Sequence, residues 1–209
     1  MDNLNIGASK PNPFITHVVK IQSWIRMKLI NRKLLIPSSK YQTKVWRKTR
    51  DWYSNGKSNE CECYQIKMVE RITKLNLIRT SDRIHMESLS IVNKKYPLKD
   101  IDGFEYTENF DGVQHIGKCK VYYNLKFVCD AGGAQTRSLR EVYHFLKCQL
   151  KVLLTSNNIY FINILDGDTS YKSMNKYLHL IDSPEYSAIK KNIFIGDLAM
   201  FQSWWPSCI

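Results

Sequence analysis

The chain has 209 residues, of which 44% are hydrophobic and 12% aromatic. This composition supports one packed domain with an arm and excludes wholesale disorder. No apolar run approaches the roughly 20 residues that a helix needs to cross a bilayer, and the first residues lack the features of a secretory signal. We therefore expect an intracellular protein, cytoplasmic or nuclear, that is not secreted and has no membrane partner.

Basic charge is concentrated at the N-terminal end of the chain. There are 31 Lys and Arg against 19 Asp and Glu, which gives a net charge of +12. Residues 1–50 hold 11 of the bases and one acid, whereas the rest of the chain is almost neutral. A basic arm on a neutral body suits a polyanion such as nucleic acid. The alternatives from charge alone are a solvated Lys-rich surface, a membrane surface or a calmodulin-like partner.

The first segment is expected to form that arm. Residues 1–14 contain two prolines and are predicted to be a loose leader. Residues 15–34 place apolar side chains on one helical face and bases on the rest, which predicts an amphipathic helix. Ile21, Gln22 and Arg26 resemble the start of an IQ motif of the calmodulin-binding kind, although the rest of that pattern is displaced. The helix would serve equally as a phosphate-contacting arm or a docking helix.

Residues 40–55 alternate bases with aromatic side chains. The aromatic members are Trp46, Trp52 and Tyr53. Such interleaving suits a surface that follows a phosphate backbone, although the rings would equally suit a core. The candidate phosphate contacts are Lys44, Arg47, Lys48 and Arg50.

The periodicity of the remaining sequence predicts an α/β domain over residues 37–209, preceded by the arm at 1–36. The expected elements are a helix over 60–76, a strand or helix end at 88–92, strands near 110–115 and 120–129 joined by a turn at Gly117 and Lys118, a helix over 136–155, a strand over 159–165, helices near 170–180 and 184–191, and a strand over 192–196.

Three polar residues of the predicted hairpin carry a resemblance to a known family. Asp111 opens one strand, and Asn124 and Lys126 lie two residues apart on the next, so that both face the same side. This pattern resembles the PD-(D/E)XK nuclease superfamily, which includes many type II restriction endonucleases. The resemblance covers about residues 58–165 and includes the order of helices and strands around the hairpin. It implies a restriction-endonuclease-like mixed β-sheet flanked by helices.

The resemblance also implies a site and a cofactor. Asp111 would bind Mg²⁺, Asn124 would supply a neutral ligand, and Lys126 would hold the attacking water. The family has Asp or Glu where this chain has Asn124. That departure implies either a carboxylate borrowed from elsewhere, with Glu62 and Glu108 as candidates, or a fold that has lost its activity.

We therefore expect a Mg²⁺-dependent, sequence-specific endonuclease that cuts double-stranded DNA. Cutting both strands of a palindrome would call for a homodimer. The alternative is a non-catalytic nucleic-acid-binding protein on the same fold. A further alternative is an interaction protein that docks through the IQ-like helix.

An acidic run and a glycine-rich loop lie on either side of the second strand. The acidic run, which ends at Asp111, makes Glu108 a candidate metal ligand. In the loop that opens the 136–155 helix, Thr136 is expected to cap the helix. Gln135 and Arg137 are candidates for contacts to base edges.

Other chemistries have less support in the sequence. Asp166 and Asp168 follow a buried strand, where α/β sheets place ligands, but an ordinary Asp-Gly turn explains them as well. The six cysteines and five histidines lack the spacing of a zinc site, and we expect reduced thiols. No phosphate-binding glycine motif and no G-x-S-x-G motif occurs. The aromatic C-terminal tail is expected to pack on the body.

Overall fold

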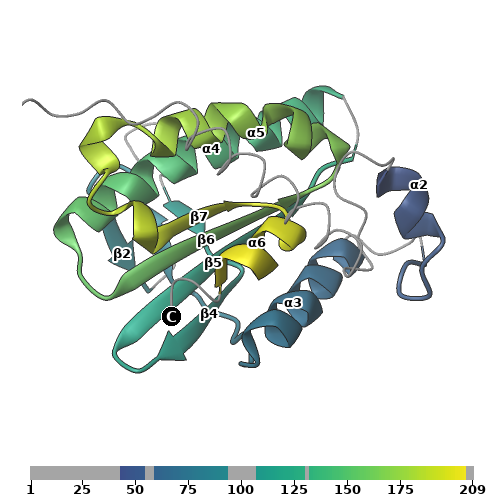
Figure 1. The fold of residues 1–209 in the computed structure, drawn as a ribbon, viewed down its shortest axis with the longest axis horizontal. Helices are drawn as coiled ribbons and strands as arrows, with labels where there is room; N and C mark the ends of the chain where they lie inside the picture. The colour runs from purple at the N-terminus through teal and green to yellow at the C-terminus, as the bar shows by residue number, and fades with distance from the viewer. Residues whose placement is uncertain (1–42, 55–58, 94–106, 130–131, 206–209) are drawn as a thin grey trace, which may run out of the picture.

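A computed structural model describes residues 43–54, 59–93, 107–129 and 132–205 (Figure 1). The predicted leader, the IQ-like helix and the boundary between residues 36 and 37 lie outside these ranges. Within the described part, no helix is long and apolar enough to span a bilayer.

The main sheet has four strands in the order β4-β5-β6-β7. β4 (Gly112–Ile116) runs antiparallel to β5 (Cys119–Phe127), and Gly117 makes the turn between them with a φ of 57°. β5 runs parallel to β6 (Ile159–Asp166), which in turn runs parallel to β7 (Ile193–Gly196). The chain is therefore an α/β protein with a mixed sheet, as the sequence predicted.

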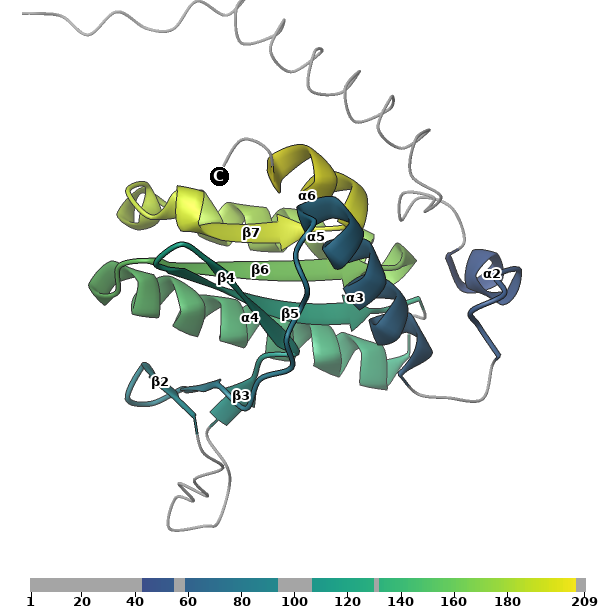
Figure 2. The same cartoon turned by 90° about the horizontal axis from the view of Figure 1, so that it is seen from below.

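Helices cover both faces of this sheet (Figures 1 and 2). α4 (Gly133–Thr155) connects β5 to β6, and α5 (Asp168–Ile181) connects β6 to β7. Right-handed crossovers between successive parallel strands place both helices on the same face. α3 (Glu60–Thr73) and α6 (Leu198–Trp204) cover the other face. The short α2 (Thr43–Lys48) lies beside the beginning of α3.

A second, smaller sheet precedes the hairpin. Its strands are β1 (Arg83–His85), β2 (Ser90–Val92) and β3 (Thr107–Asn109), in the order β2-β1-β3. Only β2 coincides with a predicted strand. Ile84 of β1 is fully buried and joins the core beneath α4, which attaches the small sheet to the domain.

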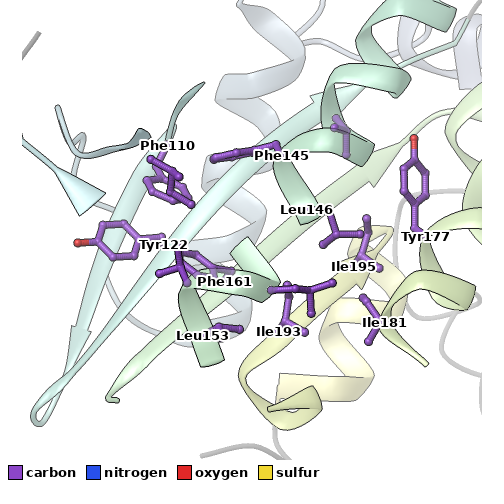
Figure 3. Close-up of a cluster of buried hydrophobic side chains, with 14 of the residues drawn as sticks. Phe110, Tyr122, Phe145, Leu146, Leu153, Phe161, Tyr177, Ile181, Ile193 and Ile195 are labelled. Carbon is purple, nitrogen blue, oxygen red and sulfur yellow. The ribbon is translucent and has the colours of Figure 1, made fainter. Parts of the chain in front are cut away.

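Two hydrophobic clusters hold the layers together, because β5 alternates its side chains between the two faces. Tyr122 faces α4 and α5, where it stacks on Phe110 with ring centroids 4.6 Å apart, and Phe110 also stacks on Phe161 (Figure 3). Tyr123 faces α3 and α6 and meets Phe201 edge to face. The packing of α6 on this face confirms the prediction that the aromatic tail packs on the body, as far as residue 205.

Several elements differ from the sequence prediction. The predicted helix at 184–191 is wrong, because the chain forms two single 3₁₀ turns there, at Pro184–Tyr186 and Lys190–Asn192. Among these residues only Tyr186 is buried and Ile189 is half-buried, so a longer helix would have no continuous apolar face. α3 ends at Thr73 because Lys74 turns into the left-handed region. α4 begins at Gly133, three residues before the predicted start.

Gly167, between β6 and α5, provides a test of this packing. Its φ is 106°, and an added Cβ would lie 2.1 Å from the Val128 carbonyl oxygen. We expect Gly167→Ala to lower the free energy of unfolding by about 2 kcal/mol or more, because the strain and the clash both fall on the backbone. Urea denaturation measures the change.

Gly133→Ala is the matched control, because an added Cβ there has no atom within 4 Å. It lies in the first turn of α4, where alanine favours the helix, so its stability should equal or exceed that of the unmodified protein. Equal loss in both variants would contradict the packing described here.

Candidate functional site

Asp111 lies between β3 and β4 and is bonded to β5 at two points. Its amide donates to the Tyr123 carbonyl at 2.8 Å, and its Oδ2 accepts a hydrogen bond from the Leu125 amide at 2.6 Å. Burial raises the pKa of the Asp111 carboxyl, as does the charge of Glu62, whereas the Leu125 bond and the charge of Lys126 lower it. The carboxylate is therefore held in place beside one positive and one negative side chain.

Lys126 lies one residue before the end of β5 and acts on two acids. Its positive charge lowers the pKa of Glu108 as well as that of Asp111. Burial has the larger effect on Glu108 and raises its pKa, and the charges of Glu141 and Asp111 raise it further. The charge of Lys126 thus acts on both acids, whereas the charge of Glu62 acts on Asp111.

Asn124 faces the same side of β5 as Lys126, as predicted, but its side chain lies in the core and is only 1% exposed. Its Nδ2 donates to Asn163 Oδ1 at 3.1 Å, and Asn163 Nδ2 donates to Gln149 Oε1 at 2.7 Å. The Gln149 amide donates back to Asn163 Oδ1. Asn124 Oδ1 is buried and accepts no hydrogen bond. Asn124 is therefore part of a buried amide network that leaves one oxygen available.

The oxygen atoms at this end of β5 include two carboxylates that could ligate Mg²⁺, those of Asp111 and Glu108. Within the described ranges, no three His, Cys, Asp or Glu side chains lie close enough to hold a metal by themselves. Mg²⁺ does not require such a cage, because one or two carboxylates, waters and substrate phosphates commonly complete its shell. Asp111 and Glu108 have carboxylates whose burial disfavours their charge, and a cation would relieve that cost. The donor set therefore fits Mg²⁺ held jointly with a phosphate.

The predicted phosphate contacts lie on and after α2. Lys44 and Lys48 are exposed. Arg47 lies over the Tyr53 ring at 5.0 Å and donates to the Cys61 sulfur at 3.6 Å, whereas Arg50 lies over the Trp46 ring. The two arginines are thus positioned by aromatic rings, so the interleaved pattern provides both packing and charge.

The predicted base contacts lie in the first turn of α4. Thr136 is not the cap, because the helix begins at Gly133, and its hydroxyl donates to the Gly132 carbonyl. Gln135 is half-buried and bends back over Gly132, where an added Cβ would lie 2.6 Å from its Oε1. Arg137 is exposed, and its side chain makes no hydrogen bond, ion pair or ring contact within the described part of the chain, so of the three it is the one best placed to reach a ligand.

The sequence analysis missed a buried polar link between α3 and the sheet. Gln65 is fully buried, and its Nε2 donates to the Lys126 carbonyl at 3.0 Å and to Asp166 Oδ2 at 2.7 Å. Asp166 Oδ1 accepts from the Leu198 amide. The site therefore includes the carboxyl ends of β5 and β6. A polar residue within the apolar stripe of α3 was the only sequence signal for Gln65.

Comparison with known proteins adds no relative, since no family model, curated protein or solved structure matches the chain.

The buried carboxyl of Asp166 should make the free energy of unfolding depend on pH. Burial and the negative charge of Asp197 raise the pKa of Asp166, the hydrogen bonds from Gln65 and Leu198 lower it, and the net result is a rise from 3.8 to about 7. Between these two values the native protein holds a proton that the unfolded chain has lost. The Asp166 contribution to the free energy of unfolding is therefore present at low pH and declines as the pH rises toward 7.

We expect Asp166→Asn to remove this decline, because an amide stays neutral at every pH. Urea denaturation of both proteins across the interval measures the difference in slope. Asp182→Asn, an exposed position, is the control and should keep the slope of the unmodified protein. A variant at Asp166 whose slope equals that of the unmodified protein would show that Asp166 does not hold the proton.

Proposed function

We propose that this protein is a Mg²⁺-dependent endonuclease of the restriction type, which hydrolyses phosphodiester bonds in double-stranded DNA. The observation that carries the proposal is that Asp111, just before β4, accepts a hydrogen bond from the Leu125 amide of β5, next to Lys126, whose charge lowers the pKa of Asp111. The resemblance stated from the sequence also supports it: a helix, a hairpin, a helix and a strand occur as α3, β4–β5, α4 and β6, with the short strands β1–β3 between α3 and β4. Cutting both strands would use two copies of the chain related by a two-fold axis.

In this proposal each residue has a role that its position supports. Asp111 and Glu108 hold the cation. Asn124 Oδ1 has no hydrogen-bond partner, but it is buried in the core and would have to turn toward the cation to serve as a neutral ligand. When bound, Mg²⁺ would polarise the scissile phosphate and acidify a water. Lys126 orients the attacking water and offsets negative charge that develops on the phosphate oxygens.

Further residues support the site from α3 and bind the DNA. Glu62 adds negative charge beside Asp111. The bases of α2 contact the phosphates, and Arg137 and Gln135 probe base edges from the start of α4.

The test is incubation of unmethylated plasmid and genomic DNA with the protein, in Mg²⁺ and in EDTA. We expect discrete fragments in Mg²⁺ alone. Lys126→Ala should lower the cleavage rate by about a hundredfold or more, since it removes a charge that stabilises the transition state. Asp111→Ala should have a similar effect because it removes a cation ligand.

Lys120→Ala is the matched control. Lys120 is an exposed lysine of the same strand that pairs with Asp82 at 3.9 Å, far along β5 from Lys126. The cleavage rate of the Lys120→Ala variant should equal that of the unmodified protein. Intact DNA in every lane, or equal loss in the Lys120 and Lys126 variants, would overturn the assignment.

A second function is favoured by the surroundings of Asn124. The amide replaces the family's carboxylate and is engaged by Asn163 in the core. A chain that has lost a carboxylate there would keep the fold and the basic surface but not the cleavage, and would act as a non-catalytic nucleic-acid-binding protein.

The binding function predicts DNA retention without cleavage. Affinity should fall steeply with salt, with a slope on logarithmic axes of about −0.9 for each duplex phosphate contacted. Replacing the exposed Lys44 and Lys48 together by alanine should make this salt-dependence slope shallower by up to about 2. Fluorescence anisotropy of labelled duplex in EDTA measures it, and a slope unaltered by both changes would contradict the role of α2.

A further inference from the structure

We propose that the outer side of α3 carries a second nucleic-acid site, which binds an unpaired nucleotide of a single strand through the Trp52–Tyr64 ring pair and the cations around it. This site is separate from the end of β5 and does not depend on cleavage. Gln65 of α3 is turned to the sheet, whereas Lys67 and Arg71, which line the cavity, are exposed on another flank of the helix.

The site is a cavity of about 590 Å³ with an aromatic and basic lining. This volume lies within the range of small-ligand pockets. It is formed by the segment after α2 and one flank of α3. Its lining includes Trp52, Cys63, Tyr64, Lys67, Met68 and Arg71.

The rings provide a stacking surface. Trp52 and Tyr64 lie nearly parallel, with centroids 4.4 Å apart and an interplanar angle of 13°. Trp46 meets the Tyr64 ring edge-on, with centroids 5.8 Å apart, and so fixes its plane. Both members of the pair are half-buried, so each presents part of its surface to the cavity. A flat aromatic ligand such as a nucleobase is the kind of group that packs against such a pair.

The charges around the rings select an anion. Lys67 and Arg71 are exposed, and no carboxylate in the described ranges forms an ion pair with either of them. Arg71 belongs to the cavity lining, and the Arg50 guanidinium lies over the Trp46 ring at 4.9 Å. Burial and the charge of Asp166 raise the pKa of Tyr64 to about 12, against the lowering effect of Arg50 and Arg71. Glu60, an acid of the same lining, accepts hydrogen bonds from the Ser54 amide and hydroxyl. Because Glu60 is engaged by Ser54, the positive charges of Lys67 and Arg71 are left to attract a phosphate.

The depth of the rings distinguishes a single strand from a duplex. In a duplex the base faces are stacked on one another, and a protein meets only their edges and the backbone. A half-buried ring pair inside a concave site is reached by a base only when that base is splayed out of its stack. Aromatic rings beside several cations are the combination that binds single strands without strict sequence preference.

The test uses a short fluorescein-labelled oligothymidylate, the duplex of the same length, and an abasic oligonucleotide of the same length, all in EDTA. Anisotropy titration measures the three affinities. We expect the oligothymidylate to bind more tightly than the abasic strand by about tenfold, because stacking of a base on aromatic rings is lost. Equal affinity of the two strands would overturn the stacking site.

Charge-reversal variants locate the binding. Lys67→Glu and Arg71→Glu lie at exposed helix positions and should each weaken oligothymidylate binding by about tenfold. Trp52→Leu should remove the preference for the strand that carries bases. Thermal melting by circular dichroism checks that each variant is folded.

Lys147→Glu is the matched control, because Lys147 is also exposed on a helix and lies over an aromatic ring, that of Tyr143 at 5.2 Å. Its oligothymidylate affinity should change by less than about twofold, which is the effect of net charge alone. Loss in the Lys147 variant equal to that in the Lys67 and Arg71 variants would overturn the site. The site would also be overturned if the Lys67 and Arg71 variants lowered the affinity for the duplex more than the affinity for the single strand.

The experiment is independent of the proposed endonuclease. If DNA is never cleaved but the base-dependent binding is seen, the endonuclease proposal fails and the single-strand site stands. If cleavage is seen while the oligothymidylate and abasic strands bind equally, the reverse holds.

Discussion

The pairing of β5 with two different neighbours is the constraint on which the rest of the fold depends. β4 joins it in the antiparallel direction. β6 joins it in the parallel direction, and this second pairing extends over Lys120 to Phe127. The antiparallel pair brings Asp111 to the Leu125 amide, and the parallel pair brings Asp166 level with the end of β5. A slip of one residue in either pairing would turn the polar ends of the strands into the core and the apolar side chains outward.

α3 connects the two candidate sites because a helix presents different residues on its opposite flanks. On the flank toward the sheet, Gln65 binds the Lys126 carbonyl and Glu62 lies near Asp111. On the outer flank, Tyr64 and Lys67 line the cavity beside Trp52. A strand held at one flank therefore lies within a helix diameter of groups at the other, about 10 Å.

Long, regular elements were predictable from the sequence, whereas contacts between distant residues were not. The alternation over 120–129 and the apolar run over 159–165 predicted β5 and β6, because each is a long strand with buried faces. β1 and β3 have three residues each, too few for any periodicity. Within the site, Asp111 and Lys126 followed from a local pattern. Gln65 did not, since its partners lie 61 and 101 residues further along the chain.

The amide network around Asn124 constrains how this position can evolve. Asn163 Oδ1 accepts from Asn124, and Asn163 Nδ2 donates to Gln149 and to the Phe194 carbonyl. A carboxylate at position 124 would set an acceptor against the Asn163 oxygen, and turning the Asn163 amide over would set that oxygen against the Phe194 carbonyl. The three amides therefore form an epistatic unit. On this hydrogen-bond pattern, exchange of the amide for an acid at position 124 calls for a compensating change on β6 or α4.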